Sequence, residues 1–147
     1  MIEIKYLGLK DKHVLTNVAP DVFDNQPNAD FVTEFFSNSN HHLVVAIEGE
    51  LVVGFASAIS YIHPDKPKDL WINEVGVAPA YQRQGIGKKL LQELLNIGHK
   101  IGCYEAWVLT NKSNTPAMKL YKSVGSDYPP ENTVMFTFKI NGNSQTI

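Results

Sequence analysis

Apolar residues recur with two different periods along this 147-residue chain, and each period predicts a different element. Where every second residue is apolar, as from Ile2 to Tyr6, a half-buried strand is expected. Alternating or continuously apolar runs predict six strands, at residues 2–6, 43–47, 51–62, 71–77, 104–109 and 133–140. Glu48-Gly49-Glu50 joins the second and third strands as a hairpin, and Pro79, which cannot donate to a sheet ladder, ends the fourth.

Apolar residues three and four apart predict an amphipathic helix after the fourth strand. Its apolar stripe consists of Leu90, Leu91, Leu94, Leu95, Gly98 and Ile101. Gly102 is a natural stop just beyond this stripe. A second helix is predicted over residues 114–124, with Asn114 as its N-cap. Weaker patterns predict helices at residues 9–18 and 30–36.

This order of elements, β-α-α-β-β-β-α-β-α-β with room for one more short strand near Ser126, predicts a single α+β domain over residues 1–147. A hydrophobic fraction of 44% and a charged fraction of 19% are globular values. The net charge of −2 gives no electrostatic support for a nucleic-acid partner. No apolar run approaches the ~20 residues that span a bilayer, so no membrane association is expected. Since no leader pattern opens the chain, we expect a cytoplasmic enzyme or binding domain.

The stretch between the fourth strand and the long helix, Gln82 to Lys88, predicts an anion-binding turn. The first amide N–H groups of a helix have no partner within it and lie at the positive end of its dipole. Gly85 and Gly87 lack a Cβ, so a bulky anion can approach the backbone, while Arg83 and Lys88 add positive charge. A phosphate or pyrophosphate is the expected guest. The alternative is an ordinary strand-to-helix loop with solvated basic residues.

Two well-known phosphate motifs do not fit this turn. Lys89 stands where a Walker A loop needs Ser or Thr, and Leu90 stands where a dinucleotide fingerprint needs a third small residue. The turn resembles instead the Gln/Arg-x-x-Gly-x-Gly/Ala signature of the GCN5-related N-acetyltransferase (GNAT) superfamily. The matching residues are Gln82, Arg83, Gln84, Gly85, Ile86 and Gly87.

A second stretch carries the same resemblance. Asn114, Ala117 and Tyr121 match the family's Asn-x-x-Ala-x-x-x-Tyr helix, and two motifs in the right order are more specific than either alone. The resemblance covers nearly the whole chain. It implies a GNAT fold, with a mixed and mostly antiparallel sheet whose central strands splay apart to bind acetyl-CoA. We expect the bulge that opens the sheet at Gly76. The resemblance also implies that homodimers are common.

The same resemblance implies how acetyl-CoA is held. Pantetheine would pair, like an added strand, with the backbone of Val75, Gly76 and Val77. The turn from Gln82 to Lys88 would bind the pyrophosphate. A backbone N–H near Val77 or Ala78 would face the thioester oxygen, where negative charge develops.

In the second helix motif, Asn114 and Ala117 match cofactor-contacting positions, and Asn114 can serve as N-cap as well. Tyr121 matches the family position beside the leaving sulfur, where a phenol can donate a proton to the thiolate. The alternative is a core aromatic residue.

The acceptor amine must lose a proton before it attacks. An alkylammonium has a pKa near 10.4, so its neutral form at pH 7 lies ~4.6 kcal/mol uphill. Glu74, just before the cofactor segment, is the carboxylate that we expect to attract the cation and take its proton, directly or through water. The alternative is a strand-edge glutamate paired with a lysine or arginine.

A looser resemblance, to the type I aminoglycoside 3-N-acetyltransferases, lies in the stretches 71–75 and 134–136. We therefore expect a small-molecule primary amine as substrate, with aminoglycosides and related amines as candidates. Loops flanking the cleft would supply Asp24, Asp127 and Glu131 to a polycationic acceptor, although surface carboxylates are usually just solvated. Two alternatives stay open. One is an acyl-CoA-binding regulatory module without turnover, and the other is a protein or peptide N-acetyltransferase.

The remaining reactive side chains are weaker candidates. His41 and His42 start a strand and are expected to be exposed. His63 lies in a loop that could reach the acceptor cleft, but a histidine beside a proline is expected to be solvated. Cys103 opens a strand and is expected to be a small buried hydrophobe. Because the five histidines form no ligand spacing with Cys103, we expect no metal.

Overall fold

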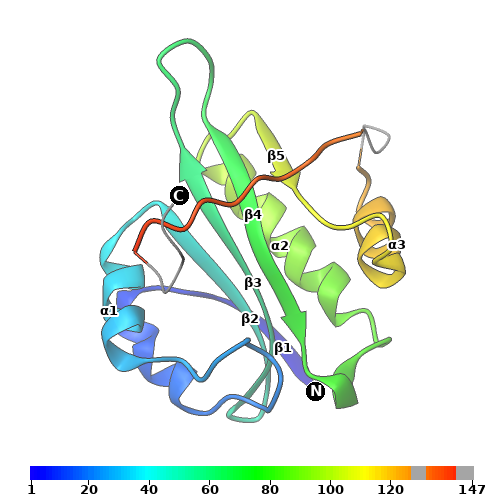
Figure 1. The fold of residues 1–147 in the computed structure, drawn as a ribbon. Coiled ribbons are helices and arrows are strands. Elements are labelled where there is room, and N and C mark those ends of the chain that lie inside the picture. Colours follow the sequence, from blue (N-terminus) through cyan, green and yellow to red (C-terminus); the bar gives the residue numbers. More distant parts are fainter. Residues whose placement is uncertain (127–131, 142–147) are drawn as a thin grey trace.

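The computed structural model describes residues 1–126 and 132–141 (Figure 1). Five strands form one sheet in the order β1-β2-β3-β4-β5 within these residues. They are β1 (Ile2–Leu7), β2 (His41–Glu48), β3 (Leu51–Tyr61), β4 (Asp69–Val77) and β5 (Glu105–Val108). The first three pairings are antiparallel and β4 pairs with β5 in parallel. The predicted mixed, mostly antiparallel sheet of an α+β fold is therefore confirmed.

Helices and loops cover both faces of this sheet. The helices are η1 (Leu9–Thr16), α1 (Ala29–Ser37), η2 (Pro79–Tyr81), α2 (Ile86–Lys100) and α3 (Thr115–Ser123). On one face α2 packs against β2, β3 and β4 and buries the predicted stripe, with Leu90 and Leu94 completely inaccessible. On the other face Phe23, in the segment that joins η1 to α1, stacks on Phe55 of β3 with ring centroids 4.0 Å apart. In the described part of the chain, no helix has the length and apolarity needed to cross a bilayer.

The two neighbours of β4 differ in length. β4 pairs with β3 from Asp69 to Val77, but with β5 only from Asp69 to Ile72. Figure 1 shows β4 continuing past the end of β5, whose chain turns away toward α3. Backbone N–H and C=O groups of residues 73–77 that point away from β3 therefore have no strand to pair with. This open edge is the splay that the family resemblance implies.

The bulge in β4 lies at Asn73 and not at Gly76, where it was predicted. Glu74 and Ile72 oppose consecutive residues of β3, so Asn73 is the extra residue between them. An extra residue reverses the alternation of side chains. Glu74 consequently points to the same face as Trp71, although a regular strand would direct these two side chains to opposite faces.

Gly76 is required for a different reason. It pairs in regular register with Phe55. A Cβ at Gly76 would lie 2.3 Å from the carbonyl oxygen of Val22 and 2.8 Å from the Phe55 ring. The glycine therefore lets the segment that joins η1 to α1 approach the strand backbone closely.

The predicted last strand, 133–140, is wrong. Residues 132–140 pair with no strand of the described chain. Five of their apolar side chains are 75–86% exposed: Val134, Met135, Phe136, Phe138 and Ile140. Alternation in a sequence shows that one face could be buried, whereas a strand also needs a neighbour to satisfy its backbone. The further strand considered near Ser126 would run into residues 127–131, outside the described residues.

His42, which was expected to be exposed, is only 3% exposed. The Tyr6 hydroxyl lies 2.8 Å from its Nδ1, and its Nε2 lies 2.8 Å from Oγ of Ser60. Burial lowers the pKa of His42, so the ring stays neutral. Burial also raises the pKa of Tyr6, which therefore remains a donor. If the neutral His42 ring accepts a hydrogen bond from Tyr6 and donates one to Ser60, both of its ring nitrogens have a partner.

Replacing Gly76 by alanine is expected to lower the free energy of unfolding by about 1–3 kcal/mol, because the new Cβ must displace the Val22 carbonyl and the Phe55 ring. Gly8→Ala is the matched control, since the nearest contact of a Cβ there would be Oδ2 of Asp11, at 3.9 Å. Urea denaturation of both variants measures the effect. Equal midpoints for Gly76→Ala and the wild type would contradict the close approach.

Candidate active site

A tight turn with two residues in the left-handed region leads into α2. Gly85 is the N-cap with φ of 79°, and Arg83 has φ of 63°. The conformation explains the glycine at position 85, while a non-glycine residue at positive φ is uncommon and is often found at functional sites. The amides of residues 86–88 follow at once and have no carbonyl partner within the helix.

Positive charge at this turn is not neutralised. Arg83, Lys88 and Lys89 are exposed, and none of them forms an ion pair with a carboxylate of the described residues. The helix dipole adds to the same field. Free amides beside unpaired cations are the arrangement that binds a phosphate group.

Several residues of the predicted signature have structural partners that the sequence did not reveal. Nε2 of Gln82 donates to the Val77 carbonyl at 3.0 Å and fastens the turn to the end of β4. Gln84 makes a longer contact, 3.5 Å, with the Ala80 carbonyl. A Cβ at Gly87 would lie 3.3 Å from Leu120, so this glycine also lets α2 and α3 pack closely. Ile86 is 3% exposed and can offer a ligand only its backbone.

The open edge of β4 presents specific backbone groups. The Ala78 N–H donates to the Val53 carbonyl of β3 at 2.8 Å, so it is not free to face a thioester. Because successive residues of a strand direct their backbone groups to opposite sides, Val75 and Val77 direct theirs to the open edge. Gly76 lies between them and directs its own toward β3.

Asn114, which precedes α3, and Tyr121 within α3 are the two residues of the second motif that carry polar side chains. Oδ1 of Asn114 accepts from the Ala117 N–H at 3.2 Å, which confirms Asn114 as N-cap. Tyr121, about two turns further along, is half-buried, and its hydroxyl has no hydrogen-bond partner among the described residues. Burial raises the pKa of Tyr121, so the phenol remains protonated at neutral pH and is able to donate.

Glu74 lies where the splay of the sheet begins. The bulge directs its side chain to the face opposite α2, and the side chain is exposed. No described lysine or arginine pairs with it, so the structural ion pair considered as the alternative is not present among these residues. A free carboxylate therefore stands directly before the open backbone edge of residues 75–77.

Of the three carboxylates expected to bind the acceptor, Asp24 belongs to the described part of the chain. Asp24 is exposed, two residues after Val22, whose carbonyl lies against Gly76. It therefore belongs to the segment that covers the Glu74 face. Asp127 and Glu131 lie outside the described residues.

Sequence reasoning missed a linked group of side chains on the Glu74 face. Trp71 and Trp107 stack with centroids 5.4 Å apart and planes at 11°. Nε1 of Trp107 donates to the Tyr61 hydroxyl, and the Tyr61 ring meets His63 edge-on at 5.0 Å. His63, which was expected to be solvated, is 18% exposed and pairs with Asp69 at 3.2 Å. Trp71 and Trp107 meet through strand register, which no local pattern in the sequence reveals.

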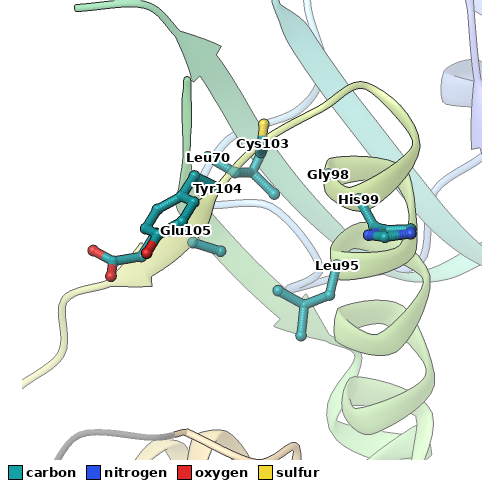
Figure 2. Close-up of a pocket in the computed structure, with 8 residues that line it drawn as sticks. Leu70, Leu95, Gly98, His99, Cys103, Tyr104 and Glu105 are labelled. Atoms are coloured by element: carbon teal, nitrogen blue, oxygen red, sulfur yellow. The ribbon is translucent and has the colours of Figure 1, made fainter. Parts of the chain in front are cut away.

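A pocket between α2 and β5 lies on the α2 face of the sheet, opposite these groups (Figure 2). Its lining residues are Leu70, Leu95, Gly98, His99, Cys103, Tyr104, Glu105 and Ala106. It adjoins the C-terminal end of α2, roughly 20 Å along the helix from the turn, so it is not the anion site. Burial raises the pKa of Cys103, which keeps the thiol protonated. No described group of three or more His, Cys, Asp and Glu could hold a metal ion.

Known acetyltransferases resemble this chain in sequence or in fold. Over 102 residues the chain is 38% identical to the N-alpha-acetyltransferase RimI of Mycobacterium tuberculosis. This match covers 69% of the chain but only 61% of that relative. An aminoglycoside acetyltransferase from an uncultured soil metagenomic sample, solved with trehalose, superposes with a TM-score of 0.84 at 21% identity. The superposition covers 95% of this chain and 96% of that one, and it shows a shared fold.

A ribosomal-protein-alanine N-acetyltransferase from Brucella melitensis biovar Abortus has the same fold, with a TM-score of 0.71 at 15% identity and coverage of 95% and 100%. The model of the acetyltransferase (GNAT) family matches residues 13–125, which include the turn from Gln82 to Lys88, Glu74 and Tyr121. The chain therefore belongs to the acetyltransferase (GNAT) family.

Proposed function

We propose that this protein is an acetyl-CoA-dependent N-acetyltransferase whose acceptor is the primary amine of a small molecule. The observation that carries the proposal is the arrangement around β4. An unneutralised basic turn follows the strand, an open backbone edge occupies residues 75–77, and Glu74 faces away from α2. The basic turn would bind the pyrophosphate, the open edge would bind the pantetheine, and Glu74 would bind the amine.

The chain offers separate groups to each part of acetyl-CoA, which when bound supplies an acetyl thioester. The amides of residues 86–88, with Arg83 and Lys88, would hold the pyrophosphate. The outward N–H and C=O groups of Val75 would pair with the pantetheine amides as an added strand does, whereas the Val77 carbonyl already accepts from Nε2 of Gln82. Since Ala78 donates to β3, the Val77 N–H is the group left to stabilise charge on the thioester oxygen.

The two substrates would meet through the gap between β4 and β5. Glu74 attracts the ammonium group on one face and takes its proton, directly or through a water. The neutral nitrogen would attack the acetyl carbon, and the carbon–sulfur bond would break as the amide forms. Tyr121 would donate its proton to the departing thiolate, and the second proton that the nitrogen loses would return to the Tyr121 phenolate through solvent. No acyl-enzyme is required.

The identity to RimI favours a second candidate, acetylation of the α-amino group of a protein. Both candidates use the same groups on β4 and α3 and differ only in the acceptor. Thiol release measured with aminoglycosides, polyamines, amino acids and peptides separates them. Turnover confined to peptides would favour the second candidate. Tight acetyl-CoA binding without turnover of any amine would indicate a regulatory module.

Removing charge from the turn is expected to weaken acetyl-CoA binding. Arg83→Ala should raise Kd about tenfold, because a charge-assisted contact is lost, and the loss should shrink as salt rises. Lys100→Ala is the matched control, since it removes the same charge from the other end of α2. Calorimetry at low and high salt measures both. The same Kd in Arg83→Ala as in the wild type would remove the turn from the cofactor site.

Removing the Tyr121 hydroxyl is expected to slow the chemical step. Tyr121→Phe keeps the ring, so acetyl-CoA affinity should stay near the wild-type value while kcat falls about a hundredfold. Steady-state kinetics beside calorimetry separate the two effects. If kcat does not change, the residue serves packing alone.

Glu74→Gln is expected to lower kcat/KM for every amine and to flatten the rise of rate between pH 6 and 9, because water must then accept the proton. Glu3→Gln, an exposed carboxylate on β1, is the control. Rate profiles against pH measure both variants. Full activity of Glu74→Gln across this range would assign the proton transfer to another group.

A further inference from the structure

We propose that Trp71, Trp107 and Tyr61, together with Asp69, form a second acceptor subsite on the Glu74 face of the sheet, which binds the distal ammonium group of a long diamine. We call this group the distal subsite. The inference rests on the proposed function and names the class of acceptor: an amine with a second cation far from the reacting nitrogen.

Strand register places the distal subsite on the same face as Glu74. Directly opposed residues of antiparallel strands share a face, and side chains two or four residues apart on one strand do so as well. Asp69 opposes Tyr61 and Glu74 opposes Ser57, and β3 has no extra residue between these two positions. The backbones at Asp69 and Glu74 are thus about 13 Å apart, the length of four strand residues.

The aromatic pair lies between the two carboxylates. Trp71 opposes Ile59, midway between Ser57 and Tyr61. Trp107 belongs to β5 but donates to Tyr61 on β3, so its indole reaches across β4 against Trp71. Both indoles are partly exposed. Aromatic rings of this kind bind methylene chains and attract cations.

Asp69 has an oxygen available for a ligand. Its side chain is 15% exposed, and His63 contacts only Oδ2. Oδ1 has no hydrogen-bond or ion-pair partner among the described residues. Lys68, its neighbour in the chain, forms no ion pair with it, and the Nζ of Lys68 donates instead to the Ile101 carbonyl. A carboxylate held largely out of water beside aromatic rings attracts a cation more strongly than one in bulk solvent.

Glu105 extends this negative charge. It opposes Asp69 across the parallel β4–β5 pairing and is exposed. Figure 2 shows its carboxylate directed away from α2. No described lysine or arginine forms an ion pair with it.

The order along this face is therefore carboxylate, aromatic pair, carboxylate. An ammonium, an apolar spacer and a second ammonium match that order. A short diamine with its reacting nitrogen at Glu74 cannot reach Asp69, whereas a diamine with about eight methylenes can span most of the roughly 13 Å between the two backbones. The distal subsite thus selects for spacing as well as for charge.

The test compares acetylation of diaminopropane, diaminooctane and octylamine. We expect kcat/KM for diaminooctane to exceed both others by about tenfold. In Asp69→Asn the advantage of diaminooctane over octylamine should fall to about twofold or less. Asp65→Asn is the matched control, because this 70% exposed carboxylate lies in the loop between β3 and β4 and pairs only with Lys66. It should keep the wild-type ratio.

Calorimetric binding of diaminooctane, measured without acetyl-CoA, separates the subsite from the enzyme function. Binding that weakens in Asp69→Asn and Trp107→Leu, without acetylation of any amine, would support the cation site and overturn the proposed function. Acetylation of amines with the same ratio in wild type and Asp69→Asn would overturn the subsite and leave the function standing. If Asp69→Asn does not fold, Trp107→Leu decides, and an unchanged ratio there overturns the subsite.

Discussion

The side chain of Glu74 faces away from α2 only because β4 contains one residue more than the stretch of β3 with which it pairs. The extra residue, Asn73, lies immediately after the last pairing between β4 and β5. Two effects therefore coincide at one point of the sheet. A carboxylate changes face, and the backbone that follows it loses a neighbour. An unpaired backbone segment needs a hydrogen-bonding partner from elsewhere, and an extended molecule with amide groups can be that partner.

Charge is divided between the two sides of this point. The turn before α2 holds exposed cations without a described counter-ion, while the opposite face of the sheet holds Glu74, Asp69 and Glu105 around an aromatic pair. The net charge of −2 conceals this separation. A polyanion and a polycation could each approach one side without competing for the other, and in the proposed reaction their reactive ends would meet where β4 and β5 part.

The features that the sequence predicted correctly are formed by residues close together in the chain. The turn at residues 82–88 and the N-cap Asn114 are both of this kind, so the sequence alone predicts where the turn and the cap lie. The Trp71–Trp107 stack and the burial of His42 arise from register between distant strands, which spacing does not record. The sequence shows a glycine at position 76, but it does not show why a side chain is excluded there, which is the close approach of the Val22 carbonyl. The segment 133–140 has a strand pattern but no partner in the described sheet.

The stacked indoles also give this protein an optical property. The chain has two tryptophans, and both are in the stack. Its indole emission therefore originates on one face of the sheet, beside the carboxylates, and none arises from the turn at residues 82–88 or from α2. Two nearly parallel indoles 5.4 Å apart are also close enough for their electronic transitions to couple. The unlabelled protein thus carries its own chromophore at the place where an amine would bind, with a near-ultraviolet circular dichroism signal that depends on how the two rings are held.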